Sequence, residues 1–153
     1  MGQNGRLLNM HLIENKKARF DYDFHQTIEA GIELMGTEVK AIKNGIGSLV
    51  GARVIIRGGE AYLLGATIPP YQAKNAPAGY DPDRTRRLLL SKKELRTLAT
   101  IEKGLTVVPM YCYTKGKLIK LAFGIGRKRK AYDKREVLKE RTDDRELARS
   151  LKT

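Results

Sequence analysis

The sequence predicts a mainly β fold, in which a small barrel of antiparallel strands carries short helices and a basic C-terminal tail follows. Three observations support this fold class. Apolar and polar residues alternate with the period of two that half-buried strands show. Gly58 and Gly59 separate two apolar runs, as a tight hairpin turn does. Finally, no long helical segment joins two strands, as a parallel sheet would require.

The first third of the chain is expected to form two strands and a short helix. Residues 19–24 and residues 27–35 alternate apolar with polar side chains and therefore predict the strands. The helix is expected at residues 38–43. Thr37 would be its N-cap, and Gly45 would end it.

The middle of the chain predicts a hairpin, a loop and a second helix. The hairpin strands are residues 54–57 and 60–64. Residues 71–85 are rich in proline, glycine, alanine and aspartate, which favours a long functional loop. A capping box begins at Ser91 and predicts a helix that continues until Gly104.

Residues 105–113 and 118–125 are expected to be the last strands, with Pro109 at an edge or a bulge. Five or more strands with one or two short helices in about 115 residues indicate a small barrel. An OB-fold-like barrel fits best, because that architecture accepts a capping helix between strands. The expected units are a flexible N-terminus (1–12), an OB-fold-like domain (13–126) and a basic C-terminal tail (127–153).

The charge of the chain is strongly positive. Its 153 residues carry a net charge of +13. The tail holds eleven basic and six acidic residues, which leaves +5 there and +8 on the rest. Such a balance favours a nucleic acid or an anionic membrane surface as partner. The tail has too few apolar residues for a core of its own, so we expect it to be disordered when free and helical when bound.

Several classes of protein find little support. No apolar run approaches the roughly 18 residues of a membrane span, and the amino terminus lacks a secretory signal. The single cysteine, Cys112, fits a reducing cytoplasm and is expected in the core. Two distant histidines give no metal-ligand spacing, and Gly124-Ile125-Gly126 lacks the third glycine of a dinucleotide fingerprint. We therefore expect a cytoplasmic protein that is no enzyme and needs no cofactor or metal.

Contact with phosphate groups is better supported. Arg84, Arg86 and Arg87 precede an apolar strand, and guanidinium groups match phosphate in two-point fashion. Tyr71 and Tyr80 flank the same loop and could stack on unpaired bases. The alternative is a solvated basic loop whose tyrosines fold onto the core.

Five motifs occur in a fixed order along the chain. They are Asn15-Lys16-Lys17-Ala18, Glu29-Ala30-Gly31, Gly36-Thr37-Glu38-Val39-Lys40, residues 81–90 and Asp133-Lys134-Arg135. From about residue 15 onward, the chain thereby resembles the SsrA-binding protein (small protein B) family of bacteria. The resemblance implies an OB-fold adaptor that binds the tRNA-like domain of transfer-messenger RNA (tmRNA, or SsrA RNA). The adaptor delivers this RNA to stalled ribosomes for trans-translation, in which the nascent peptide is tagged and the ribosome is rescued.

The same resemblance implies partners and two sets of site residues. The partners are tmRNA, the ribosome at its small-subunit rRNA, decoding centre and mRNA channel, and elongation factor Tu in the delivery complex. The RNA-binding residues would be Asn15, Lys16, Lys17, Glu29, Glu38, Lys40, Arg84, Arg86, Arg87 and Leu89. The residues facing the decoding centre would be Gly126, Arg127, Lys128, Arg129, Lys130, Tyr132, Asp133, Lys134 and Arg135.

The chain departs from the family pattern at a few positions. Ala41 and Lys43 stand where the family often has serine and arginine, and Tyr132 stands where some members have histidine. Two other functions stay open at this point. One is a general OB-fold protein that binds or assembles ribosomal RNA, and the other is an RNA-modifying enzyme, for which the sequence offers no catalytic site.

Overall fold

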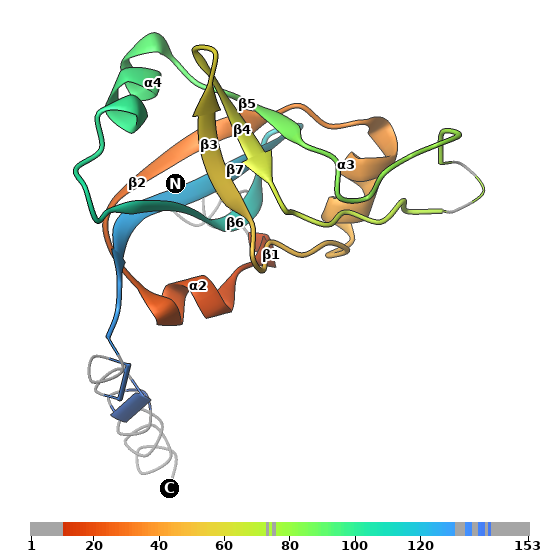
Figure 1. Cartoon of the computed structure of the whole chain (residues 1–153). Coiled ribbons are helices and arrows are strands. Elements are labelled where there is room, and N and C mark those ends of the chain that lie inside the picture. Colours follow the sequence, from red (N-terminus) through yellow and green to blue (C-terminus); the bar gives the residue numbers. More distant parts are fainter. Residues whose placement is uncertain are drawn as a thin grey trace, which may run out of the picture.

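The structure is a computed structural model that describes residues 11–72, 74, 76–130, 134, 135, 138, 139 and 141. In chain order its elements are β1 (His11–Glu14), α2 (Lys16–Asp21), β2 (Tyr22–Ile32), α3 (Gly36–Lys43), β3 (Arg53–Arg57), β4 (Glu60–Leu64), β5 (Arg86–Leu89), α4 (Lys92–Ala99), β6 (Thr106–Lys115) and β7 (Leu118–Lys128). The strands form one seven-stranded sheet in the order β1-β6-β7-β2-β5-β4-β3 (Figure 1). Every ladder is antiparallel. The predicted mainly β fold with short helices is confirmed.

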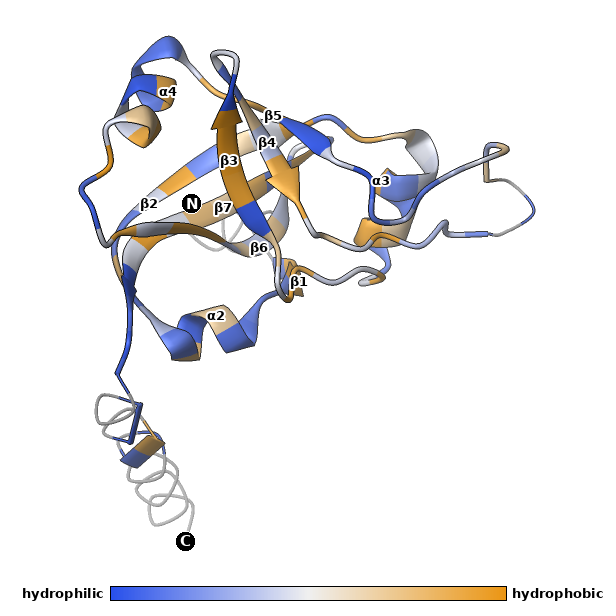
Figure 2. Cartoon of the chain, in the orientation of Figure 1, coloured by the Kyte–Doolittle hydropathy of each residue, from blue (hydrophilic) through white to orange (hydrophobic). Residues whose placement is uncertain are grey.

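The sheet curls around one apolar core. β1 and β3 are its edge strands, and β3 turns back to contact β6 (Figure 1). Ile42, Leu63, Leu121 and Phe123 lie in this core without any exposed surface. Figure 2 shows the apolar residues along β3 and β7 and the polar ones on the segment that leaves β7 toward the C-terminus.

The expected strand at residues 19–24 is wrong in its first half. Residues up to Asp21 belong to helix α2, whose N-cap Asn15 accepts a hydrogen bond from the Ala18 backbone N–H at 3.1 Å. β2 then starts at Tyr22 and runs on as a single long strand, with a register shift near His25 where two separate strands were expected. The alternation of aromatic residues does not distinguish these structures, and the cap at Asn15 decides for the helix.

Helix α3 begins earlier than expected. Its N-cap is Met35 rather than Thr37, and the Met35 backbone N–H donates to the Glu38 carboxylate at 2.7 Å. The Thr37 hydroxyl instead accepts a hydrogen bond from the backbone of Tyr71 at 3.2 Å. Gly45 follows the helix with a positive φ of 75°, as the stop signal predicted.

The two-residue hairpin and the capping box at Ser91 are confirmed. Gly58 and Gly59 connect β3 to β4 with φ angles of 59° and 77°, which glycine adopts without strain. The Ser91 and Glu94 side chains each accept a hydrogen bond from the other's backbone N–H. However, α4 ends at Ala99, well before the expected stop at Gly104.

Pro109 lies at a bulge, as predicted, because the ladder between β6 and β7 shifts register just after it. The unit boundaries of the sequence analysis fall inside strands: β1 starts at His11, before residue 13, and β7 ends at Lys128, after residue 126. The division into units itself stays a prediction, since residues 1–10 and most of 131–153 lie outside the described residues. In the described ranges, no helix is long and apolar enough to span a membrane.

Two glycines of β7 let this strand lie close to β2. A Cβ atom on Gly126 would lie 2.1 Å from the Asp23 carbonyl oxygen, and one on Gly124 would lie 2.4 Å from the Phe24 ring. Neither site has room for a side chain. The Gly124-Ile125-Gly126 segment therefore serves the packing of two strands just before the chain leaves the sheet.

Replacing Gly126 by alanine is expected to lower the free energy of unfolding by about 1–3 kcal/mol, the usual cost of overpacking. The clash is with backbone, which cannot move aside as a flexible side chain can. Gly36→Ala is the matched control, because a Cβ atom there meets nothing within 4 Å. Urea unfolding of both variants tests this, and equal stability of Gly126→Ala and wild type would contradict it.

Candidate RNA interface

A buried ion cluster links α3 to the start of β5. Glu38 and Arg86 both have 0 % exposure. The Arg86 Nε and Nη2 atoms donate to Glu38 Oε2 at 2.8 and 2.6 Å. Arg84 donates from Nε to the same oxygen at 3.0 Å and from Nη2 to Glu38 Oε1. One carboxylate thus holds two guanidinium groups.

The remaining donors of this cluster are also satisfied. Arg86 Nη1 donates to the backbone oxygen of Ala66 at 2.9 Å, and Nη2 donates to that of Pro82 at 2.9 Å. The Tyr80 hydroxyl lies 2.6 Å from the Ile68 backbone oxygen and 3.0 Å from Glu38 Oε2. A buried ion pair is stable only with such complete pairing. The cluster therefore fastens both ends of the loop between β4 and β5 to α3.

The protonation of the cluster follows from these contacts. Burial would raise the pKa of Glu38, but the hydrogen bonds from Arg84, the Met35 backbone and Arg86 together outweigh it and hold the pKa below its ordinary value of 4.5. Burial, and then the hydrogen bond with Glu38, raise the pKa of Tyr80. Glu38 is thus charged and Tyr80 neutral at physiological pH.

Three of the predicted RNA-binding residues point into the protein. Besides Glu38 and Arg86, Asn15 is only 3 % exposed. Its Nδ2 atom donates to the backbone oxygens of Leu49 and Pro109, each at 3.1 Å. Asn15 thereby joins α2, the segment before β3, and β6. These three side chains lie beneath the surface and act on it through the elements that they hold.

Other predicted residues lie on the outer face of the sheet. Gly31 pairs with Leu89 of β5 and with Lys120 of β7, and a Cβ atom on Gly31 would lie 3.3 Å from Leu89 Cδ1. Glu29 shares this face, two residues earlier on β2. The side chain of Leu89 spans the Gly31 position and is 49 % exposed. We call Glu29, Leu89 and Lys120 the sheet patch.

Lys120 was not selected from the sequence. The alternation of residues 118–125 could have placed it opposite the core face, but only the ladder shows that it meets Gly31 on one side and Tyr113 on the other. Burial raises the pKa of Tyr113, and the neighbouring Glu29 carboxylate raises it further. The sheet patch therefore holds a carboxylate, an ammonium group and an exposed leucine together.

The remaining cations differ in how freely they could meet phosphate. Arg87 already pairs with Glu33 at 2.9 Å and with Glu60 at 3.2 Å, and these carboxylates raise its pKa. Lys16, Lys17 and Lys40 are exposed. A phosphate contact by Arg87 requires it to exchange a carboxylate partner.

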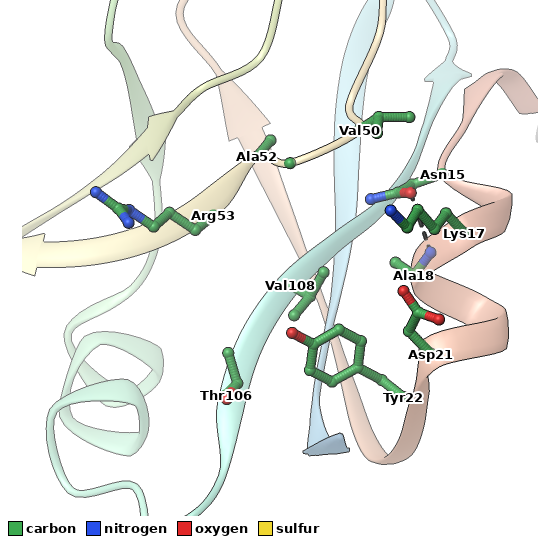
Figure 3. A pocket seen from close by; sticks show the side chains of 11 residues that line it. Asn15, Lys17, Ala18, Asp21, Tyr22, Val50, Ala52, Arg53, Thr106 and Val108 are labelled. Atoms are coloured by element: carbon green, nitrogen blue, oxygen red, sulfur yellow. Dashed lines mark hydrogen bonds between the residues drawn. The ribbon is translucent and has the colours of Figure 1, made fainter. Parts of the chain in front are cut away.

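Lys17 also lines a cleft between α2, the segment before β3, and β6 (Figure 3). The cleft has a volume of about 360 Å³, and Tyr22, Arg53 and Thr106 also line it. Val50 stands at its rim with 55 % exposure. Two basic side chains and an apolar rim are features that suit RNA.

The residues predicted to face the decoding centre begin at the end of β7, where Tyr22, Asp23 and Phe24 of β2 pair with Lys128, Arg127 and Gly126. The next residues, Arg129 and Lys130, continue from this strand. Lys134 and Arg135 are helical, and so are Leu138, Lys139 and Arg141. The predictions for Tyr132 and Asp133, and for most of the tail, lie outside the described residues.

Outside these groups, Cys112 is a core residue, as expected. It is 1 % exposed, and burial raises its pKa to about 12. Tyr80, which the sequence suggested for base stacking, has its hydroxyl engaged in the ion cluster and is half-buried. Tyr71 is 42 % exposed and keeps its ring accessible.

Replacing Glu38 by glutamine is expected to lower the free energy of unfolding by about 3 kcal/mol or more, because Arg86 is left as a buried charge without its counter-ion. Glu33→Gln is the matched control, since its pair with Arg87 is exposed and contributes at most about 1 kcal/mol. Denaturant unfolding at pH 7 compares the two variants, and similar losses in both would contradict the buried pairing.

The stability difference between wild type and Glu38→Gln should also depend on pH. Because folding lowers the pKa of Glu38 below 4.5, the carboxylate contributes its full stability above pH 4.5 and loses it as the pH falls below that value. Unfolding curves between pH 7 and pH 3 should therefore converge toward the acid end. A difference that stays constant over this range would refute the assignment.

Comparison with known proteins places these features in one family. The family described as "SmpB protein" matches residues 12–153. The SsrA-binding protein of Synechocystis sp. is 46% identical over 141 residues, covering 91% of this chain and 92% of that protein. The SsrA-binding protein of Gloeothece citriformis is 43% identical over 152 residues, covering 98% and 97%.

A solved structure shows the same relationship. It is described as "tmRNA-SmpB: a journey to the center of the bacterial ribosome" and superposes with a TM-score of 0.64 at 44% sequence identity. The match covers 77% of this chain and 84% of that one. On sequence and fold together, this chain belongs to the SmpB family of SsrA-binding proteins.

Proposed function

We propose that this chain is an RNA-binding adaptor of ribosome rescue. It binds the tRNA-like domain of tmRNA and delivers it to stalled ribosomes, where trans-translation tags the nascent peptide. The observation that carries the proposal is the family match over residues 12–153, together with the structural match to a chain described as tmRNA-SmpB on the bacterial ribosome. The net charge of +13 suits a polyanionic partner.

The sheet patch is the proposed contact with unpaired or distorted RNA. Leu89 offers an apolar surface on which a base or ribose can pack. The Glu29 carboxylate can accept hydrogen bonds from base amino groups, and Lys120 beside it can pair with phosphate. Lys16, Lys17 and Lys40 add phosphate contacts that raise affinity without reading sequence.

The buried residues serve this surface indirectly. Glu38 and Arg86 fasten the loop between β4 and β5, and Arg84 shares the same carboxylate at the edge of the cluster. Asn15 holds α2, from which Lys16 and Lys17 project. The role of these residues is to fix the positions of exposed groups before RNA arrives, which lowers the entropic cost of binding.

The second task belongs to the chain after β7. Gly126, Arg127, Lys128, Arg129 and Lys130, followed by residues 132–135, are proposed to face the decoding centre, and the tail to enter the mRNA channel. Elongation factor Tu is the proposed companion during delivery, and the cytoplasm is the proposed location. The chain acts by binding and requires no catalytic group of its own.

Leu89→Ala is expected to weaken binding of the tRNA-like domain by about tenfold, since burying an exposed leucine side chain contributes about 1.5–3 kcal/mol. Leu118→Ala is the matched control, because Leu118 is an exposed leucine at the start of β7. Gel-shift titration at fixed salt measures both. An unrelated hairpin of equal charge tests the function itself: if wild type bound it as tightly as the tRNA-like domain, the proposed function would fail.

Replacing Arg127, Lys128, Arg129 and Lys130 by glutamine is expected to abolish tagging while changing tmRNA affinity only about threefold or less, an effect of overall charge. A reconstituted translation reaction on a message without a stop codon measures tagging, and the gel shift measures affinity. Parallel loss of both activities would refute the division of labour between barrel and tail.

A further inference from the structure

The chain that leaves β7 contacts helix α2, and the proposed function gives this contact no role. The last residues of α2 are Phe20 and Asp21, which lie directly before β2. β2 in turn pairs with the end of β7. Because Gly126 allows β7 to approach the Asp23 backbone, the tail leaves the sheet beside the end of α2 (Figure 1).

Asp21 holds the departing chain at two points. Its backbone oxygen accepts a hydrogen bond from the Arg129 N–H at 2.7 Å. Its carboxylate lies 3.0 Å from the Lys134 ammonium group, and the two side chains are only 16 % and 28 % exposed. One residue of α2 thus binds the chain both before and after residues 131–133.

Phe20 provides a second contact for the same segment. The Lys134 ammonium nitrogen lies 5.9 Å from the centre of the Phe20 ring, and the guanidinium carbon of Arg141 lies 5.7 Å from it. Both distances are within the range of a cation–π interaction. Lys134 and Arg141 are both helical, and a spacing of seven residues places two helical side chains on the same side. The Lys134 backbone N–H also donates to the Lys130 oxygen at 3.1 Å.

We propose that Phe20 and Asp21 are positioning residues, which dock the base of the tail on α2 and thereby set the direction in which the tail leaves the barrel. This inference rests on the proposed function, in which the tail has a target on the ribosome but no defined starting direction. A tail that starts from one direction loses less conformational freedom when it enters a channel.

The strength of the contact fits a positioning role. Partly exposed ion pairs and cation–π contacts are weak individually, and a phosphate group can compete for Lys134. Arg141 also lines a hollow beside α2, together with Lys16 and the ion pair of Glu14 and Arg19. The tail can therefore be docked in the free protein and yet exchange Asp21 for ribosomal RNA on arrival.

The direct test measures the tail's direction in the full-length protein. Spin labels are placed on cysteines introduced at Leu118 and Lys139, and Cys112 does not interfere because it is buried. Pulsed electron spin resonance then gives the distribution of distances between the labels. Asp21→Asn, which keeps the backbone oxygen, and Phe20→Leu should each reduce the docked population about fivefold and broaden the distribution. Asp23→Asn, a nearby exposed carboxylate, is the control and should change nothing.

A charge exchange separates this contact from a general loss of structure. Asp21→Lys combined with Lys134→Glu should restore the narrow distribution that either single change abolishes. A distribution that is unchanged in Asp21→Asn, or that the double variant does not restore, would overturn the proposal.

A functional test uses the gel shift with the tRNA-like domain and the tagging reaction. Asp21→Asn should bind the tRNA-like domain within about twofold of wild type and lose about fivefold in tagging. Equal losses in both assays would show a merely structural role and overturn the proposal. If wild type itself neither preferred the tRNA-like domain nor supported tagging, the proposed function would fail, whereas the docking of the tail on α2 would still stand on the distance data.

Discussion

The carboxylate of Glu38 is the interaction on which the RNA-facing half of the molecule depends. It lies without any exposed surface at the start of α3 and accepts hydrogen bonds from Arg84, Arg86 and the backbone of Met35. Because an unpaired charge at this depth would be costly, each partner requires the others. The helix, the loop before β5 and the first residues of β5 are thus held in one arrangement.

The sheet patch follows from that arrangement. Arg86 begins β5, and Leu89 ends it beside Gly31. Once the ion cluster fixes the start of the strand, the register with β2 decides where Leu89 stands relative to Glu29 and Lys120. A buried, satisfied cluster thereby determines the geometry of an exposed patch that contains none of its members.

At the opposite end of β2, tight backbone packing fixes the position of β7. Gly126 packs against the backbone at Asp23, so β7 ends where α2 passes into β2. Asp21, at this junction, contacts the departing chain through its backbone and its carboxylate. β2 therefore connects the two regions of proposed function: its later residues belong to the RNA-facing patch, and its first residues lie where the tail leaves.

The sequence by itself determined the structural features that short-range chemistry controls. Period-two alternation, the Gly58-Gly59 turn, the capping box at Ser91 and the bulge at Pro109 are local features, and they predicted the β class and most elements correctly. The ordered motifs were sufficient to predict the family. Only the tertiary structure decided which candidates are accessible. Asn15, Glu38 and Arg86 are polar, and their burial depends on partners 34 to 94 residues away. The strand register places Lys120 in the sheet patch, and the pairing of β2 with β7 brings Asp21 next to the tail. Both depend on long-range contacts, which no local pattern encodes.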